Sequence, residues 1–184
     1  MNLAKESYDE PNAMTIATVN EEGFPSARMV LLKEVKHNQG FVFFTNYGSR
    51  KAAEIENNPN VALVFYWDKL KRSVRVEGKA ERISAHESQD YFFSRSKASQ
   101  IGSAVSPQSQ LVQRYCFRTF SDRILYIYIR FSRDWLWNRN DDLEKKETIE
   151  MPNWGGYLVN PIRIGTALYL FIMNENVIIV CNIF

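Results

Sequence analysis

Cysteine and histidine are scarce in this sequence, which has two of each among 184 residues. Two cysteines cannot form a disulfide framework, and no cluster of cysteine and histidine has the spacing of a zinc site. The two histidines, His37 and His86, are too few to supply a multi-histidine metal site. A charge excess of one sign is also lacking, because the formal net charge is +2. A dedicated DNA-binding protein or a polybasic membrane protein is therefore not expected.

A long apolar run is absent from residues 1–14, so no secretory signal is expected there. The length fits one domain, and the fractions of apolar (45%) and charged (24%) residues are ordinary for a folded protein. These values argue against a disordered chain, a collagen and a coiled coil. We therefore expect a globular protein of the cytoplasm, with no membrane as a partner.

Short runs of β-branched and aromatic residues, separated by turn residues, predict a mainly β fold. Residues 61–67 are apolar throughout, which is typical of a strand buried on both faces or of a barrel stave. In residues 73–83, charged positions alternate with small or apolar ones, which predicts a strand with one solvent-exposed face. Gly78 in this strand predicts a bulge. Connections between the early strands are too short for parallel crossovers, so a closed or split β-barrel with flanking helices is favoured. The expected strands cover residues 14–19, 27–34, 40–46, 61–67 and 73–83.

Helices are expected at three places beside these strands. Ser49 can cap a helix over residues 50–57, because its side chain can accept a hydrogen bond from the first turn. Ser84 and Glu87 have the spacing of a capping box, which predicts a helix that ends near Arg95. A second short helix is expected to begin in the residues that follow Arg95.

Two segments differ in composition from the rest of the chain. Residues 114–131 contain six aromatic residues and four arginines but no lysine, and residues 165–184 contain one charged residue, Glu175. Both segments are too apolar for linkers. The interleaved arginines and aromatics of residues 114–139 suggest RNA binding, but no RNA-binding motif accompanies them. An apolar strand with arginines on one side explains them better, so nucleic acid is not expected as a partner.

Three interpretations of the tail, residues 165–184, stay open. A membrane anchor of this length would place Asn174, Glu175 and Asn176 near its middle, where a charge and two amides are costly. A β-hairpin would place the same residues in a turn between two apolar strands, and it is favoured over the anchor. The third interpretation is translated non-coding sequence, such as a retained intron beginning at Gly165-Thr166. Sequencing the transcript, or measuring the intact mass of the native protein, would decide that hypothesis.

Two groups of polar side chains have the chemistry of phosphate sites. Arg50 and Lys51 lie in the first turn of an expected helix, where cations oppose the helix dipole unless a phosphate binds. Tyr91 and Arg95 are neighbours at i and i+4 on one helix face. A solvated basic helix end and a tyrosine packed on an arginine stem are the structural alternatives. Further polar residues near these groups are Thr45, Asn46, Ser49, Ser99, Gln108 and Ser109.

No nucleophile–base pair stands out in the sequence, because neither cysteine has an activating neighbour and both histidines lie at turn or helix-start positions. This favours an enzyme whose cofactor carries the chemistry while the protein binds and orients. Arg28 and Lys33, five residues apart in an expected strand, should point to opposite faces unless the strand is bulged.

Several joined motifs together resemble the pyridoxine/pyridoxamine 5'-phosphate oxidase family, nearly continuously from about Asn12 to Val112 and again from Ser132 to Ile164. The resemblance implies an FMN-binding split β-barrel that forms a homodimer, with FMN at the subunit interface. It also implies oxidation of pyridoxamine or pyridoxine 5'-phosphate to pyridoxal 5'-phosphate, with O2 as the acceptor. The matching stretches are PSARMVLLK (25–33), GFVFFTNYGSRK (40–51), NPNVALVFYW (58–67), RVEGKAERIS (75–84), YFFSRSKASQIG (91–102), SPQSQ (106–110) and NWGGY (153–157).

The resemblance also implies roles for individual residues. In this interpretation Arg50 and Lys51 hold the FMN phosphate, while Gln108 and Ser109 contact FMN from the other subunit. No catalytic side chain and no metal ligand is implied. The remaining expected FMN contacts are Arg28, Met29, Val30, Leu31, Phe44 and Thr45, and the expected substrate-phosphate residues are Lys33, Tyr91, Arg95 and Ser99.

The sequence departs from the family pattern at three places. Ser73 stands where the family usually has a glutamine that contacts FMN, and residues 114–131 look like an insertion. After Ile164 the family continues with a Trp-Gln-Gly and an Arg-Leu-His-Asp-Arg segment, and this sequence contains neither. We therefore expect weakened FMN binding and reduced turnover. The alternatives are a non-catalytic barrel that binds FMN or pyridoxal phosphate, and a non-functional splice product. The expected organisation is a flexible arm (1–12), a split-barrel domain (13–164) and an atypical apolar tail (165–184).

Overall fold

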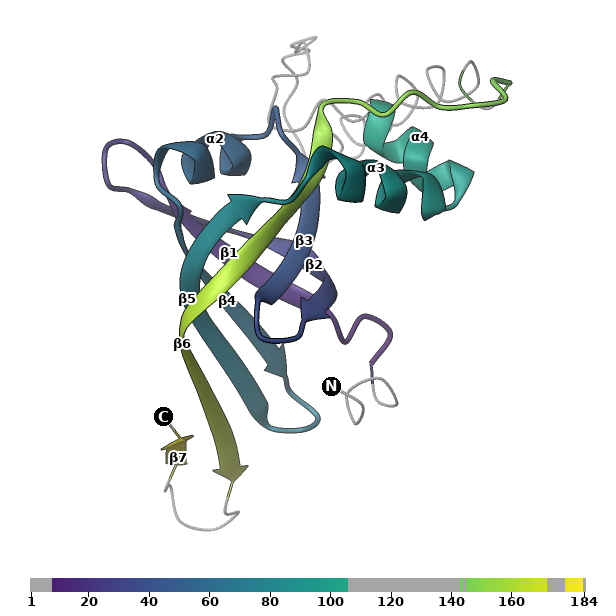
Figure 1. Ribbon diagram of the computed structural model, residues 1–184. Helices are drawn as coiled ribbons and strands as arrows, with labels where there is room; N and C mark the ends of the chain where they lie inside the picture. Colours follow the sequence, from purple (N-terminus) through teal and green to yellow (C-terminus); the bar gives the residue numbers. More distant parts are fainter. Residues whose placement is uncertain (1–7, 106–142, 144, 172–177, 184) are drawn as a thin grey trace, which may run out of the picture. The chain divides into compact units, whose positions relative to one another are not determined.

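Seven strands form one sheet in the computed structural model, which describes residues 8–105, 143, 145–171 and 178–183. The strand order is β3-β2-β1-β4-β5-β6-β7, and a further pairing of β3 with β6 closes the first six strands into a barrel (Figure 1). This confirms the predicted mainly β barrel with flanking helices. The strands are β1 (Ala13–Val19), β2 (Pro25–Lys36), β3 (Gly40–Asn46), β4 (Asn60–Trp67), β5 (Arg72–Arg82), β6 (Trp154–Phe171) and β7 (Ile178–Ile183).

Local sequence explains the first hairpin of the barrel. The turn between β1 and β2 is closed by the side-chain oxygen of Asn20, which accepts a hydrogen bond of 2.8 Å from the Phe24 amide. Gly23 has a φ of +85°, which glycine adopts without a Cβ clash. The strands then pair antiparallel, with Ile16 opposite Arg28 and Thr15 opposite Met29.

Two glycines allow strands β3 and β5 to approach β6 closely. A Cβ on Gly40 of β3 would lie 2.0 Å from the carbonyl oxygen of Val159 in β6, and a Cβ on Gly78 of β5 would lie 2.3 Å from that of Asn160. The pairing of β5 with β6 also shifts register between Glu77 and Gly78, as predicted for a bulge there. Only glycine fits at these two contacts.

The burial of side chains along β4 decides whether residues 61–67 form a strand buried on both faces or a barrel stave. Val61, Leu63 and Phe65 are buried while Val64 and Tyr66 are exposed, so β4 is a barrel stave and is not buried on both faces. The alternation in β5 follows the prediction, since Val76, Gly78 and Ala80 are buried and Arg75, Lys79 and Glu81 are exposed. The barrel interior also contains Met14, Ile16, Val42, Phe43, Tyr157 and Val159.

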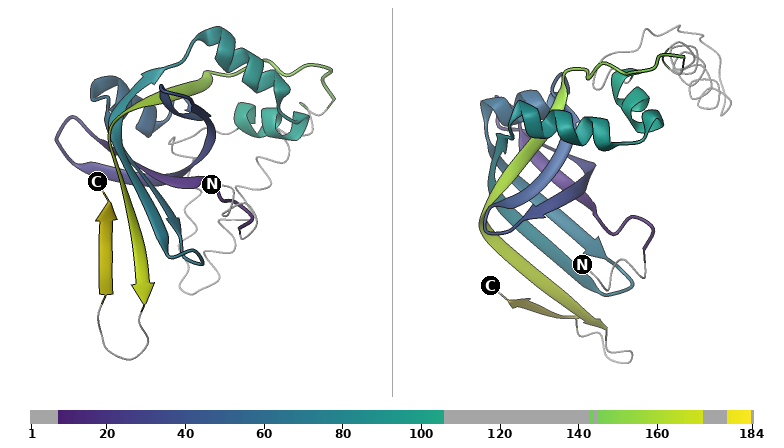
Figure 2. Two further views of the ribbon diagram at one scale, coloured as in Figure 1. Left: turned by 60° about the horizontal axis from the view of Figure 1, so that its bottom comes forward. Right: turned by 45° about the vertical axis from the view of Figure 1, so that its right-hand side comes forward.

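The helices whose bounds the described residues define are α2 (Arg50–Asn57), α3 (Ala85–Ser94) and α4 (Lys97–Val105) (Figure 2). Ser49 accepts a 3.4 Å hydrogen bond from the Ala52 amide, and Ser84 accepts a 3.1 Å bond from the Glu87 amide. Both predicted caps therefore form. No helix among the described residues is long and apolar enough to cross a membrane.

Strand β6 runs past Ile164 to Phe171, across the boundary that we predicted between the domain and the tail. Its end pairs antiparallel with β7, with Thr166 opposite Ile183 and Phe171 opposite Ile178, so the tail strands pair as the hairpin interpretation predicts. The predicted insertion, residues 114–131, lies outside the described residues.

The described part of the predicted N-terminal arm makes several contacts. Asn12 and Leu32 exchange two hydrogen bonds of 2.9 Å, one from the Asn12 side chain and one from the Leu32 amide. The Trp67 indole donates to the Pro11 carbonyl at 2.9 Å, and the Lys69 amide donates to the Tyr8 hydroxyl. These contacts attach residues 8–12 to strands β2 and β4 and to the turn after β4.

The chain divides into two units. The first takes its described residues from 1–44, 53–83 and 156–184, and it holds most of the barrel. The second takes them from 45–52 and 84–155. Among the described residues of the second unit, the buried apolar side chains are Ala52, Phe92, Ile101, Val105, Ile149 and Trp154.

Candidate functional site

The predicted site residues fall in both units. Arg28, Met29, Val30, Leu31, Lys33 and Phe44 belong to the first unit, and Thr45, Arg50, Lys51, Tyr91, Arg95 and Ser99 belong to the second. Gln108 and Ser109 lie outside the described residues. Each unit therefore offers its own group of side chains.

The end of β3 and the start of α2 form a compact cationic cluster in the second unit. The ammonium of Lys51 lies 3.1 Å from the hydroxyl of Thr45 and 3.4 Å from that of Ser49. Thr45 and Ser49 are buried, whereas Arg50 is exposed. Two hydroxyls, an ammonium and the first amides of a helix are the donor set that phosphate groups bind. The structure thus brings Thr45, a predicted FMN contact, next to Lys51, one of the two residues of the predicted phosphate clamp.

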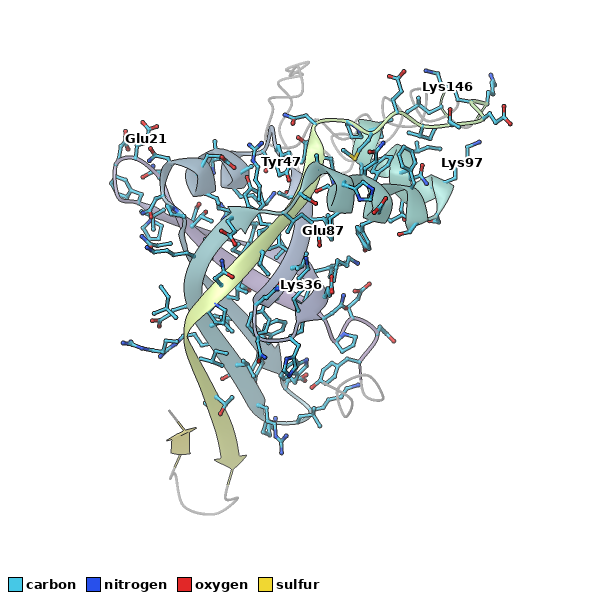
Figure 3. The ribbon with its side chains drawn as sticks, viewed as in Figure 1. Glu21, Lys36, Tyr47, Glu87, Lys97 and Lys146 are labelled. Carbon is cyan, nitrogen blue, oxygen red and sulfur yellow. The ribbon has the colours of Figure 1, made fainter. Side chains whose placement is uncertain are left out.

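The turn that carries this cluster is attached to the segment before β6. The amide of Tyr47, labelled in Figure 3 between β3 and α2, donates a 2.8 Å hydrogen bond to the Asn153 carbonyl. A Cβ on Gly155 would lie 2.3 Å from the Tyr47 hydroxyl oxygen and 2.6 Å from the ring. Because Gly155 has no side chain, the Tyr47 ring can pack directly against its backbone.

Arg28 of β2 is held by a buried carboxylate in the first unit. Its guanidinium lies 2.9 Å from Glu54 of α2, and it donates at 2.5 Å to Thr18 and at 2.6 Å to Ser26. The same Glu54 oxygen accepts from both hydroxyls. Burial alone would raise the pKa of Glu54, but the hydrogen bonds from Thr18, Ser26 and Arg28 outweigh it and lower the pKa from 4.5 to about 2. Glu54 is therefore a carboxylate at neutral pH.

The other predicted FMN contacts on β2 differ in their exposure to solvent. Met29 is 63% exposed, and Val30 and Leu31 are half-buried. Lys33 is exposed and lies where the pairing of β2 with β3 shifts register, between Leu32 and Glu34. The strand is therefore bulged at Lys33, which is the condition under which Arg28 and Lys33 need not follow regular alternation.

Arg95 lies at the centre of the second cluster of the second unit. Its guanidinium carbon is 4.8 Å from the centroid of the Trp154 ring, within cation–π range. Trp154 is 6% exposed and stacks on Tyr91 with centroids 6.2 Å apart and rings 10° from parallel. The structure thus brings Tyr91 and Arg95 together on one indole ring, as the predicted phosphate cluster requires.

Helix α4 supplies two hydrogen-bond partners of the Arg95 side chain. The guanidinium donates a 2.8 Å hydrogen bond to the Ser103 hydroxyl and a 2.9 Å hydrogen bond to the Ser99 carbonyl. The Ser99 hydroxyl itself lies 3.0 Å from the hydroxyl of Ser96. Ser99 therefore meets Arg95 through its backbone, while its predicted role was a side-chain contact with the phosphate.

The electrostatics of this cluster favour an anion. Burial lowers the pKa of the Arg95 guanidinium, and the neighbouring Tyr91 opposes that effect. Burial raises the pKa of the Tyr91 phenol, so it stays protonated and can donate a hydrogen bond. Among the residues that the structure describes, no carboxylate forms an ion pair with Arg95. A half-buried cation in this setting gains from a negatively charged ligand.

Sequence reasoning missed three residues that shape these clusters. Trp154 was noted only as part of the NWGGY motif, and Ser103 and Glu54 were not singled out. The i, i+4 spacing of Ser99 and Ser103 on α4 was a usable signal for Ser103. No local signal links Glu54 to Arg28 or Trp154 to Arg95, because those partners are far apart in the chain. Ser73, in place of the family glutamine, is half-buried on β5.

Comparison with known proteins points to one family. A family model described as "Pyridoxamine 5'-phosphate oxidase" matches residues 3–120. Proteins named pyridoxine/pyridoxamine 5'-phosphate oxidase are similar over most of this chain. The one from Leptospira interrogans is 46% identical over 156 residues, which are 84% of this chain and 65% of the relative. The one from Bombyx mori is 45% identical over 164 residues, 86% of this chain and 56% of the relative. The chain thus spans about two thirds or less of the length of these relatives.

Solved structures resemble the fold at low sequence identity. PhzG from Burkholderia lata, solved with tetrahydrophenazine-1-carboxylic acid, has a TM-score of 0.75 and 18% identity, over 99% of this chain and 86% of its own. A pyridoxamine 5'-phosphate oxidase-related, FMN-binding protein from Nostoc punctiforme has a TM-score of 0.64 and 18% identity. The match covers 90% of this chain and 78% of that protein. These likenesses support the split-barrel fold.

Proposed function

Since this chain belongs to the pyridoxamine 5'-phosphate oxidase family, we propose that it binds FMN and oxidises pyridoxamine or pyridoxine 5'-phosphate to pyridoxal 5'-phosphate, with O2 as the acceptor. We place this reaction in the cytoplasm and the site at the interface of a homodimer. The relatives with this name share 45–46% identity with the chain over more than four fifths of its length. The shared sequence includes the β2, β3–α2 and α3–α4 segments that hold both cationic clusters.

The observation that carries the proposal is the setting of Arg95. Its half-buried guanidinium lies over the Trp154 ring, beside a protonated Tyr91, and has no carboxylate partner among the described residues. A phosphate ester supplies the negative charge that this setting favours. We assign the substrate phosphate to Arg95, Tyr91 and Ser99, with Lys33 as a further contact.

The second cluster fits a second phosphate, that of FMN. Lys51, Thr45 and Ser49 gather donors at the start of α2, and Arg50 adds an exposed guanidinium. Two separate cationic clusters suit a reaction with two phosphate-bearing ligands. The other proposed contacts of FMN are Arg28, Met29, Val30, Leu31 and Phe44 in each subunit, with Gln108 and Ser109 from the other.

The protein's part in the reaction is to bind and orient. FMN, when bound, supplies the chemistry by accepting a hydride from the C4' carbon of the substrate and passing the electrons to O2, which gives H2O2. Arg95 and Tyr91 fix the phosphate end of the substrate, so that its ring is presented in one position. Arg28, held by Glu54, Thr18 and Ser26, stays in one orientation on β2.

A specific feature of the sequence favours a second candidate function. Residues 165–184 contain no arginine and no histidine, and they occupy the place where the resemblance implies residues of both types. Loss of an arginine that contacts a phosphate costs about 1.5–3 kcal/mol. The second candidate is therefore a barrel that binds FMN or pyridoxal phosphate without turnover.

The deciding experiment starts from the purified full chain incubated with FMN and then desalted. A retained flavin absorption spectrum supports FMN binding, and formation of pyridoxal 5'-phosphate and H2O2 from pyridoxine 5'-phosphate supports the oxidase. Turnover below that of a full-length relative fits the altered residues after Ile164. Retained flavin without product would favour the binding candidate. A colourless protein that binds no phosphorylated pyridoxine would contradict both, and function would then belong to a differently spliced chain.

A further inference from the structure

We propose that Ser103 and Trp154 are positioning residues that orient the guanidinium of Arg95 for a phosphate ester. This inference rests on the proposed function, since it assigns two residues to the same phosphate site. Neither residue was among those that the family resemblance implies for binding. Both contact Arg95 directly, and both belong to the same unit of the chain.

Ser103 fixes the rotation of the guanidinium. Its hydroxyl accepts a 2.8 Å hydrogen bond from Nη1 of Arg95 and donates a 3.1 Å bond to the Ser99 carbonyl. The same carbonyl accepts the 2.9 Å bond from Nη2 of Arg95. Three groups thus form a closed hydrogen-bonded ring, and both terminal nitrogens of the arginine are held on one side by helix α4. Without the hydroxyl, the guanidinium keeps one of its two hydrogen bonds to the described residues, the bond from Nη2 to the Ser99 carbonyl.

Trp154 fixes the plane of the side chain. Its ring lies 4.8 Å from Cζ of Arg95, and it also contacts Tyr91 and Phe92, with Phe92 packed edge-on at a centroid distance of 5.5 Å. Because Trp154 is buried among aromatic rings, its own position is set by packing. A guanidinium that lies over such a ring loses rotational freedom before a ligand arrives, so less entropy is lost on binding.

The hydrogen-bond capacity of Arg95 leaves donors for a ligand. A guanidinium has five N–H groups, and the contacts with Ser103 and Ser99 use two of them in the described part of the chain. Both contacts engage the terminal nitrogens from the α4 side. The remaining N–H groups form the fork that a phosphate oxygen pair accepts.

The test measures ligand affinity of the FMN-loaded full chain. The probe is 4'-deoxypyridoxine 5'-phosphate, which cannot be oxidised at C4' and forms no Schiff base, compared with 4'-deoxypyridoxine, which lacks the phosphate. Ser103→Ala should weaken binding of the phosphorylated probe roughly three- to tenfold and leave the unphosphorylated probe unchanged. Ser103→Thr retains the hydroxyl and should restore most of the affinity. In turnover, Ser103→Ala should raise KM for the phosphorylated substrate while kcat is retained.

Ser94→Ala is the matched control, because the Ser94 hydroxyl donates a 2.8 Å hydrogen bond to the Tyr91 carbonyl on the exposed side of α3 and does not contact the Arg95 guanidinium.

Trp154→Phe is the second variant, and it should also weaken binding of the phosphorylated probe alone. Equal affinity of wild type and Ser103→Ala for that probe would overturn the positioning role while leaving the proposed function standing. Equal losses for both probes would overturn it as well, since they indicate a structural defect. A wild-type chain that binds FMN but neither probe would instead overturn the proposed substrate, and this inference with it.

Discussion

The guanidinium of Arg28 on β2 lies 2.9 Å from the carboxylate of Glu54 on α2, and this ion pair joins a strand to a helix across 26 residues of sequence. The side chain of Glu54 is 6% exposed and that of Arg28 is 20% exposed. Thr18 and Ser26 complete the coordination of the carboxylate. A buried charge with this many donors stabilises the fold only while it is ionised.

Glu54→Gln should therefore destabilise the fold at neutral pH by about 1–3 kcal/mol, because Arg28 would lose its carboxylate. The pKa of Glu54 is lowered from 4.5 to about 2, so its contribution is complete above pH 4.5 and is lost as the pH falls toward 2. Urea unfolding between pH 7 and pH 2 should show wild type and variant converging at the acid end. Glu21→Gln, in the exposed β1–β2 turn (Figure 3), is the control and should change stability by less than about 0.5 kcal/mol. A constant difference across the pH range would contradict the assignment.

Gly78→Ala should weaken the pairing of β5 with β6. The new Cβ would lie 2.3 Å from the Asn160 carbonyl oxygen, and backbone of β6 would have to move. We expect a loss of about 2 kcal/mol or more in the free energy of unfolding. Gly165→Ala, on β6 with nothing within 4 Å of its Cβ, is the matched control and should be close to neutral. Equal stability of the two variants would mean that the close approach at Gly78 is not a constraint.

Gly155→Ala should reduce FMN affinity, on the proposed assignment of the phosphate clamp. Its Cβ would overlap the ring of Tyr47, which lies in the turn just before Ser49 and the Lys51 of α2. We expect the dissociation constant of FMN to rise roughly tenfold, measured by quenching of flavin fluorescence. Tyr47→Ala in the same background should restore part of the affinity by removing the clash. Gly102→Ala, where a Cβ meets nothing within 4 Å, should leave FMN binding unchanged. Unaltered FMN affinity in Gly155→Ala would show that the Tyr47 turn does not position the clamp.

Lys51→Gln and Arg95→Gln should separate the two proposed phosphate sites. Each removes a charge-assisted contact, so each should cost roughly tenfold or more in affinity. Lys51→Gln should weaken FMN and spare the phosphorylated pyridoxine probe, and Arg95→Gln should do the reverse. The control Lys97→Gln removes an exposed charge at the start of α4 (Figure 3) and should affect neither ligand. If both variants weakened the same ligand, the assignment of separate sites would be wrong.

The local structure of this chain was largely determined by its sequence alone. Strand β3 and helix α2 have the predicted bounds, and the caps at Ser49 and Ser84 form as expected, because these features depend on residues within one or two turns of each other. The alternation in β5 predicted its buried face for the same reason.

The site clusters, in contrast, were decided by tertiary structure. Glu54 reaches Arg28, and Trp154 reaches Arg95, only because strand register and helix packing bring distant residues together. The register shift at Lys33 and the continuation of β6 past Ile164 likewise depend on which strand pairs with which. Sequence patterns report which residues share a face, whereas contacts across the sheet follow from closing the barrel, which no local pattern encodes.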